Sequence, residues 1–415
     1  MELIFRVPIF ANSKKFMRLT HSFIALTVIP LLFISCHSNS QPVVKHIDYS
    51  KFHEVPAPAA AAPLQYDTAG PKQQMLIAQL DQYYRRQVAA GFNGGVLIGM
   101  GGKVVYERYF GYSNRERRQP FAANSSSQLA SVSKTFTGAA ILYLYEHKYI
   151  ALDSPVKHYL KEFPYPNITV KMLLDHRSGL PDYTKWYENY VHDHNNPTNN
   201  ATILALMAVH VPRLESRPNT RFKYCNTNFA VLARIIEQVT NMSFESFMAR
   251  YIFQPLGMNN TFVYNANKGL PANASISYRH NWVRDPMMFA DGVSGDKGIY
   301  STPEDMYRWD QSFYHNSLLS QATVEMAYGP CSFEKRGIKN YGLGWRMLCY
   351  ANGNKIIYHN GWWHGNNTSF YRFIQQNMTI VVLGNRFTNS IYHQAPALYS
   401  IIKGVPVENG FDTED

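Results

Sequence analysis

The sequence predicts an α/β fold of the α+β type, in which an antiparallel sheet is completed by both ends of the chain and flanked by helices. Two observations indicate this fold. A helix and a hairpin are expected near the N-terminus and further strands near the C-terminus, while a mostly helical region, about residues 151–288, is inserted between them. The 415 residues, 46% of them hydrophobic and 14% aromatic, are enough to bury a large core.

The N-terminal helix is expected where apolar residues recur every three or four positions, at Ile77, Leu80, Tyr84 and Val88. The segments 94–98 and 103–106, on either side of Met100-Gly101-Gly102, are typical of a hairpin. Four strands and a closing helix are expected in the C-terminal part, at residues 341–347, 355–359, 369–374, 378–383 and 395–402.

The first residues are typical of a targeting segment. A basic stretch, residues 14–18, precedes an apolar run, residues 23–34, and Ser35 and Cys36 follow. The run is short for a membrane span and ends at a small residue, as secretory signals do. Its end resembles a bacterial lipoprotein signal, so we expect residues 1–35 to be removed, Cys36 to be lipidated, and the protein to be exported to the cell envelope or periplasm. An ordinary cleaved signal and an uncleaved anchor are the alternatives.

The rest of the chain divides by composition. Residues 36–71 are expected to form a tether, because they contain the Pro/Ala-rich sequence VPAPAAAAP. Residues 72–403 would be the folded domain and residues 404–415 a tail. Three cysteines remain beyond Cys36, which permits a Cys331–Cys349 disulfide with Cys225 as a free thiol.

The charge of the chain excludes some functions. Its formal net charge is +11, but the basic residues are scattered, and no nucleic-acid-binding motif is present. A mild attraction to anionic surfaces is the expected consequence.

His192 and His194 share a polar loop but have no evident third ligand, so neither a metal nor another cofactor is expected. The sequence does not determine the oligomeric state.

The strongest chemical signal is Ser131-Val132-Ser133-Lys134, at the start of an apolar helical pattern. Residues three apart lie one turn apart on one helix face. Ser131 would therefore have its hydroxyl in the positive field of the helix N-terminus and beside the Lys134 amine. A lysine inside a buried helix needs a partner or a function, so this pair is a candidate activated nucleophile.

The spacing alone is not specific, since Ser-x-x-Lys also occurs at Ser154/Lys157, Ser294/Lys297, Ser332/Lys335 and Ser400/Lys403. Ser154 is expected to be a helix N-cap, because Pro155 follows it. An N-capping serine with a lysine that extends toward solvent is the alternative for Ser131 as well.

Further segments follow Ser131 in a definite order, at residues 173–181 (LLDHRSGLP), 222–232 (FKYCNTNFAVL), 255–258 (PLGM), 298–306 (GIYSTPEDM) and 359–365 (HNGWWHG). With the Ser131 motif, this order resembles the serine β-lactamase-related superfamily, which contains class C β-lactamases, penicillin-binding DD-peptidases, D-aminopeptidases and related esterases. The resemblance runs from about Lys72 to Ile402 and implies a β-lactamase/transpeptidase-like fold.

The resemblance also implies a catalytic set. Ser131 would attack the substrate carbonyl and become acylated, while Lys134 and Tyr224 would carry its proton to the leaving group. Tyr224 suits that role only if nearby cations favour its deprotonated form. Asn226 would hydrogen-bond the substrate or hold Lys134.

The third family motif corresponds to His359-Asn360-Gly361, on a strand that lines the cleft, so His359 and Gly361 are expected to bind substrate. The oxyanion hole would be the backbone N–H groups of Ser131 and Trp362. Typical β-lactamases have Lys-Thr-Gly in this motif. Because histidine is only partly charged at neutral pH, its hold on a substrate carboxylate would be weaker, which argues against an efficient β-lactamase.

The sequence therefore predicts an exported, lipid-anchored serine hydrolase that cleaves amide or ester bonds, with D-amino-acid peptides of the cell wall as candidate substrates. A β-lactamase or a small-ester carboxylesterase is the alternative among enzymes. An inactive relative that binds peptidoglycan fragments or a protein partner is the alternative from another class. The intact set of Ser131, Lys134 and Tyr224 disfavours this last one.

Overall fold

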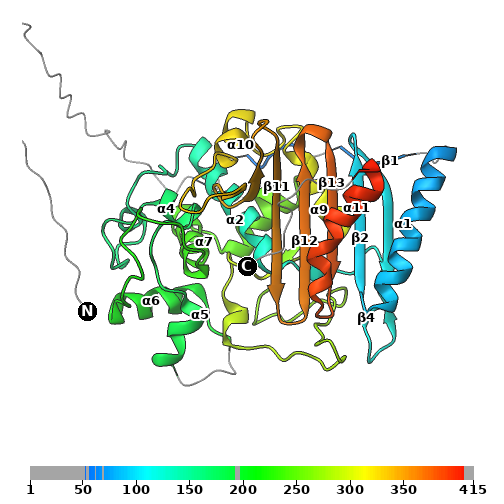
Figure 1. The fold of residues 1–415 in the computed structure, drawn as a ribbon. Helices are drawn as coiled ribbons and strands as arrows, with labels where there is room; N and C mark the ends of the chain where they lie inside the picture. The colour runs from blue at the N-terminus through cyan, green and yellow to red at the C-terminus, as the bar shows by residue number, and fades with distance from the viewer. Residues whose placement is uncertain (1–51, 53–55, 61, 68–69, 192–196, 406–415) are drawn as a thin grey trace, which may run out of the picture. The chain divides into compact units, whose positions relative to one another are not determined.

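The computed structural model describes residues 52, 56–60, 62–67, 70–191 and 197–405 of the chain. Its main feature is an eight-stranded sheet with the order β1-β3-β2-β13-β12-β11-β10-β9 (Figure 1). The strands span Gln65–Tyr66 (β1), Gly94–Met100 (β2), Lys103–Phe110 (β3), Lys339–Tyr341 (β9), Arg346–Cys349 (β10), Lys355–Trp363 (β11), Asn366–Phe373 (β12) and Met378–Gly384 (β13).

Both ends of the chain complete this sheet, as predicted. The N-terminal hairpin strand β2 pairs antiparallel with the last strand β13, in a register that runs from Met100↔Met378 to Gly94↔Gly384. The strand β1 instead runs parallel to β3. The predicted first helix is α1 (Pro71–Ala89), and the predicted closing helix is α11 (Gln394–Lys403).

Helices cover both faces of the sheet (Figure 1). On one face, α1 and α11 pack on a core that includes Ile98 and Val382. The other face buries Leu97 and Val381 against α2 (Ser133–Glu146) and α9 (Pro303–Ser312). Successive side chains of a strand point to opposite faces. Burial on both faces therefore explains why β2 and β13 are apolar over most of their length, with Thr379 of β13 as a buried polar residue.

The inserted region contains several short helices joined by loops, and less than half of its residues are helical in the part that the structure describes. Its helices are α3 (Val156–Tyr159), α4 (Val170–Leu174), α5 (Tyr183–Trp186), α6 (Asn200–His210), α7 (Asn226–Thr240) and α8 (Phe244–Met248). Residues 264–288 were expected to be part of it, but they form turns and extended segments. The remaining strands are β4 (Tyr112–Asn114), β5 (Gln119–Pro120), β6 (Ser127–Gln128), β7 (Phe262–Val263) and β8 (Ile299–Ser301), and a further α-helix is α10 (Gln321–Ala327).

The predicted tether is not entirely a linker. Phe52 is fully buried, with its ring centroid 4.9 Å from that of Tyr149 and 5.1 Å from that of Tyr251. With β1 also paired to the sheet, ordered packing begins before Lys72, because an apolar side chain of the predicted tether reaches the core. The predicted signal segment and Cys36 lie outside the described residues. Within the described ranges, no helix has the length and apolar character needed to cross a membrane.

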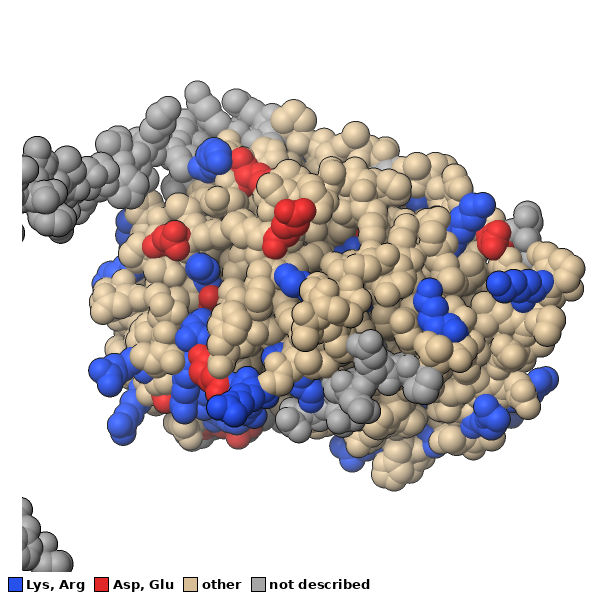
Figure 2. All heavy atoms as spheres, turned by 45° about the horizontal axis from the view of Figure 1, so that its top comes forward, with Lys and Arg blue, Asp and Glu red and all other residues tan. Residues whose placement is uncertain are grey.

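The permitted disulfide does not form, since Cys331 and Cys349 are both free thiols, as is Cys225. The expectation of scattered charge agrees with Figure 2, where basic side chains are spread over several parts of the visible face and acidic ones lie among them.

A buried ion pair joins the helical layer to the sheet. Arg372 of β12 is 1% exposed, and its Nε donates to Asp310 Oδ1 of α9 at 2.5 Å. The Arg372 guanidinium also donates to the Asp310 carbonyl at 3.2 Å and to Tyr328 Oη. A buried charge that loses its partner is costly, so this pair should stabilise the docking of α9.

We therefore expect Arg372→Met to lower the free energy of unfolding by about 3–5 kcal/mol, because it leaves the Asp310 carboxylate buried and unpaired. Equilibrium unfolding in urea measures this value. Arg108→Met is the matched control, since it removes the exposed Arg108–Asp81 pair and should cost less than about 1 kcal/mol. Equal losses in the two variants would contradict the proposed contribution of the buried pair.

Candidate active site

Ser131 lies on a tight turn that leads directly into the buried helix α2. The turn is a 3₁₀ segment, Ala130–Val132, in which Ala130 has a left-handed φ of 49°. Lys134 follows in the first turn of α2 and is completely buried. Its Nζ donates to Ser131 Oγ at 3.1 Å, so the structure places serine and lysine side by side as their spacing predicts.

Two further acceptors complete the surroundings of the Lys134 Nζ. It donates to Asn226 Oδ1 at 2.8 Å and to the Asp296 carbonyl at 2.8 Å. An ammonium group has three N–H donors and no acceptor. The three acceptors therefore match a protonated Lys134 and offset the cost of burying it.

The amide of Asn226 is held in place from the side opposite to Lys134. Asp182 Oδ2 accepts from the Asn226 backbone N–H at 3.1 Å and from Asn226 Nδ2 at 3.0 Å. This fixes the side-chain amide so that its oxygen faces Lys134 and its nitrogen faces the carboxylate. Of the two predicted roles for Asn226, the one that the contacts display is holding Lys134.

Tyr224 lies close to two cations, just before α7. Lys134 Nζ is 4.9 Å from the centroid of its ring, and the guanidinium carbon of Arg346 is 5.0 Å from it. The Tyr224 hydroxyl is buried and makes no hydrogen bond within the described structure. His176 packs on the same ring at 4.4 Å, and its Nδ1 accepts from the Cys225 backbone N–H at 3.1 Å. The backbone beside Tyr224 is therefore anchored.

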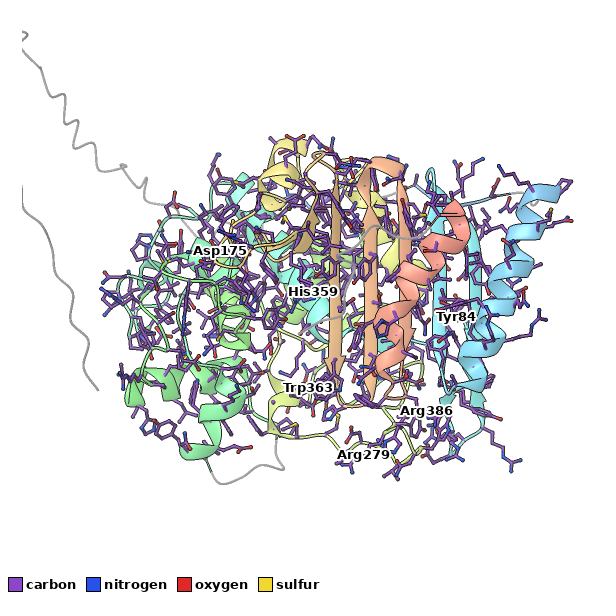
Figure 3. The ribbon with its side chains drawn as sticks, in the orientation of Figure 1. Tyr84, Asp175, Arg279, His359, Trp363 and Arg386 are labelled. Atoms are coloured by element: carbon purple, nitrogen blue, oxygen red, sulfur yellow. The ribbon has the colours of Figure 1, made fainter. Side chains whose placement is uncertain are left out.

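His359 occupies the middle of β11 (Figure 3) and differs from expectation. It is completely buried, with its Nε2 3.3 Å from Tyr341 Oη and its Nδ1 2.7 Å from the Asn360 carbonyl. Burial lowers the pKa of His359 well below its ordinary value, and the charges of Arg346 and Lys134 lower it further. The expectation of a partly charged imidazole at neutral pH is therefore wrong.

Arg346, at the start of β10, is the cation that the sequence analysis missed at this position. The sequence alone shows an arginine at the edge of a strand pattern and gives no sign that it reaches Tyr224. Its guanidinium does so because β10 lies beside β11 in the sheet.

Gly361 allows β11 to approach the Ser131 turn. A Cβ at this position would lie 2.3 Å from the Leu129 carbonyl oxygen, 2.4 Å from Thr368 Oγ1 and 3.0 Å from the Ser131 backbone nitrogen. A side chain would therefore push the strand away from the nucleophile. Close packing against the Ser131 turn therefore explains why the third motif needs a glycine at this position. This reason holds independently of any part that Gly361 plays in substrate binding.

The backbone of Trp362 faces an open strand edge. Pairing of β10 with β11 ends at Tyr358, so the next residues of β11 have no described partner strand on that side. The Gly361 carbonyl accepts from Tyr392 Oη at 3.1 Å, and the same hydroxyl accepts from Asn367 of β12 at 2.8 Å. The N–H in a trans peptide points opposite to the carbonyl. The Trp362 N–H is thus directed to the open edge, and the indole of Trp362 is 61% exposed.

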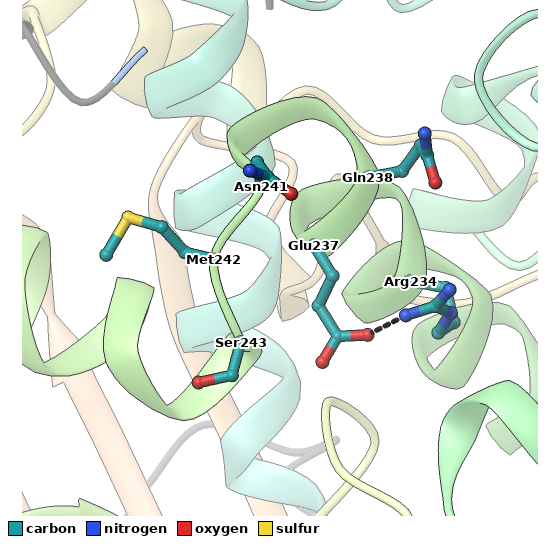
Figure 4. A pocket seen from close by; sticks show the side chains of 6 residues that line it. All are labelled: Arg234, Glu237, Gln238, Asn241, Met242 and Ser243. Atoms are coloured by element: carbon teal, nitrogen blue, oxygen red, sulfur yellow. Dashed lines mark hydrogen bonds and ion pairs between the residues drawn. The ribbon is translucent and has the colours of Figure 1, made fainter. Parts of the chain in front are cut away.

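Other sequence candidates do not join this site. The helix α3 begins at Val156 with Pro155 at its N-cap and no side-chain cap, so the expectation that Ser154 is the cap is wrong. Among the described residues, no cluster of metal-ligating side chains is present, and His192 and His194 lie outside those residues. A polar hollow at the end of α7 contains none of the predicted site residues (Figure 4); it is lined by Arg234, Glu237, Gln238, Asn241, Met242 and Ser243.

Comparison with known proteins gives consistent matches. A family model described as beta-lactamase matches residues 76–399. The chain is 32% identical over 335 residues to a penicillin-binding protein of Bacillus subtilis (strain 168), which covers 76% of this chain and 74% of that protein. It is 24% identical over 321 residues to a D-aminopeptidase of Gluconobacter oxydans (strain 621H), which covers 77% of this chain and 60% of the relative.

A solved structure, the octameric penicillin-binding protein homologue from Pyrococcus abyssi, shares the fold with a TM-score of 0.70 at 24% identity, over 80% of this chain and 78% of the other. The family model spans most of the described domain and includes every residue of the predicted catalytic set. The chain therefore belongs to the β-lactamase family, and it is a serine hydrolase related to the penicillin-binding proteins.

Proposed function

We propose that this protein is an exported, lipid-anchored hydrolase that cleaves amide or ester bonds through an acyl-enzyme on Ser131. The observation that carries the proposal is the contact between Lys134 Nζ and Ser131 Oγ inside a completely satisfied hydrogen-bond set. A buried lysine fixed at a serine hydroxyl on a helix start is the arrangement that nucleophilic catalysis requires.

In the first half-reaction, Ser131 Oγ forms a bond to the substrate carbonyl carbon. Its proton passes to Tyr224, which must be a phenolate to accept it; the Tyr224 oxygen has no other hydrogen bond among the described residues, and Lys134 lies over its ring. The negative charge on the carbonyl oxygen is stabilised by the N–H groups of Ser131 and Trp362. The bond to the amine or alcohol then breaks, and this leaving group takes the proton.

In the second half-reaction, a water attacks the acyl carbon and gives its proton to the same Tyr224–Lys134 pair. Ser131 recovers a proton when the acid departs, so the cycle returns every group to its starting state. Because Lys134 already donates all three of its hydrogens, Tyr224 is the better proton acceptor of the two. Lys134 and Arg346 both lie over its ring.

The proposed substrates are D-amino-acid peptides or related amides. One relative is named a D-aminopeptidase and another a penicillin-binding protein, which supports a peptide substrate. Two of the cations named at this site, Lys134 and Arg346, lie close to Tyr224. Lys134 is engaged with Ser131, so Arg346 is our candidate for attracting a substrate carboxylate. A small-ester carboxylesterase or a β-lactamase remains the alternative, and a panel of D-peptides, acyl esters and a chromogenic cephalosporin distinguishes the three.

We expect Ser131→Ala to abolish both hydrolysis and covalent labelling by a fluorophosphonate, while the circular dichroism spectrum stays unchanged. The side chain of Ser131 is small and partly exposed, so its loss should not disturb packing. Ser154→Ala is the matched control, from another Ser-x-x-Lys pattern, and should keep full activity. Turnover that persists in Ser131→Ala would disprove the assignment of the nucleophile.

A second prediction separates His359 from Arg346. Arg346→Gln should raise KM for carboxylate-bearing peptides and leave KM for a neutral ester almost unchanged, because only the first substrate needs the cation. His359→Gln removes no charge, since the imidazole is neutral, so it should change both substrates alike. Steady-state kinetics at neutral pH measure these values. A carboxylate-specific loss in His359→Gln but not in Arg346→Gln would reverse the two assignments.

The proposed location depends on Cys36. Cys36→Ser should move the protein from the membrane fraction to the soluble exported fraction, because the thioether-linked lipids of a bacterial lipoprotein would be lost. Fractionation followed by immunoblotting measures the shift, and mass spectrometry of the N-terminus identifies the lipid. Wild-type protein that begins at another residue and carries no lipid would refute this part of the proposal.

A further inference from the structure

A second buried lysine lies behind the catalytic centre. Lys297, just before β8, is 3% exposed and belongs to the Ser294/Lys297 pattern, which the proposed reaction does not use. Its Nζ donates to Tyr183 Oη and lies 3.2 Å from Asp296 Oδ2. The same Nζ is 4.7 Å from the centroid of the Trp363 ring.

Lys297, Asp296 and Tyr183 form a closed triangle of hydrogen bonds. Tyr183 Oη donates to Asp296 Oδ2 at 3.0 Å while it accepts from Lys297. Burial raises the pKa of Tyr183 well above its ordinary value, so this hydroxyl keeps the proton that it donates. Burial lowers the pKa of Lys297, and the Asp296 carboxylate beside it opposes that effect. A buried cation and carboxylate that satisfy each other in this way should be rigid.

Besides Ser131, the Lys134 amine has two acceptors, Asn226 and the Asp296 carbonyl, and the triangle is connected to both. The Asp296 backbone carbonyl itself accepts from Lys134 Nζ. Tyr183 directly follows Asp182, whose carboxylate accepts twice from Asn226. The position of the Lys134 amine is thus set from two sides by segments that meet at the triangle.

The triangle also contacts the end of β11 that carries the proposed oxyanion hole. Trp363, next to Trp362 in the chain, lies with its ring against Lys297 Nζ. Its indole Nε1 donates to the buried Asp291 carboxylate at 2.6 Å. Figure 3 shows Trp363 toward one end of β11, whose middle carries His359. A cation beneath this ring can hold the strand end against the loop that carries Asp296.

We propose that Lys297 is a positioning residue, which fixes the acceptors of Lys134 and the end of β11 relative to each other. The inference rests on the proposed function, because it assigns to Lys297 a part in the acylation of Ser131. Lys297 does not touch the reacting atoms. It acts through Asp296 and Trp363.

The test compares Lys297→Met with wild-type protein in the full chain. We expect the rate of Ser131 labelling by a fluorophosphonate, and kcat for an activated acyl ester, to fall about 10- to 100-fold, since small displacements of catalytic groups cost this much. KM should stay close to the wild-type value. Lys157→Met is the matched control, because Lys157 is the exposed lysine of another Ser-x-x-Lys pattern, and it should leave both parameters unchanged.

A purely structural role is tested by the double variant Asp296→Asn/Lys297→Met, which leaves no buried charge unpaired. We expect its melting temperature to recover toward that of the wild type while kcat stays low. Recovery of both, or a folded Lys297→Met variant that is labelled as fast as the wild type, overturns the inference. Wild-type protein that is not labelled at Ser131 overturns the proposed function instead, so the two failures are distinguishable.

Discussion

The burial of the Lys134 ammonium is the constraint on which the rest of the site depends. A charged amine inside an apolar helix is unfavourable unless every N–H has an acceptor. Here the acceptors come from the Ser131 turn, from the start of α7 and from the loop before β8. Three segments far apart in the sequence must therefore converge on one atom. The fold satisfies this by packing α2 in the core between the sheet and the inserted helices.

The sheet contributes to the site through the close approach of β11 to Ser131 as well as through the Arg346 cation of β10. β11 can lie against the Ser131 turn only because Gly361 has no side chain. Its edge is open beyond Tyr358, because the pairing with β10 ends there. A substrate that reaches Ser131 would lie along this edge, where β11 has no described partner strand. The position at which β10 begins therefore matters for access to the nucleophile, and its first residue, Arg346, also lies at the Tyr224 ring.

The parts of this structure that depend on local patterns could be predicted from the sequence. The pairing of Ser131 with Lys134 follows from helix periodicity, and the sheet strands follow from apolar runs. Prediction failed where a role depends on contacts between distant segments. Arg346 and Lys297 carry no local signature of their positions. The charge state of His359 was predicted wrongly because burial, which sequence alternation does not measure, decides it. Phe52 was assigned to a linker because it lies within residues 36–71, which the Pro/Ala-rich sequence VPAPAAAAP led us to predict as a tether.

The two buried lysines show how little the spacing itself determines. Ser131/Lys134 and Ser294/Lys297 share one pattern and both lysines are buried, yet Lys297 donates to Tyr183 while Ser294 bonds Asn200. Lys134 can face its own serine because both lie at one helix start, where i and i+3 are neighbours. Residues 294–297 do not form a helix, so the same spacing sends the two side chains apart. Helix geometry, and not the motif, converts a serine and a lysine into a nucleophile and its partner.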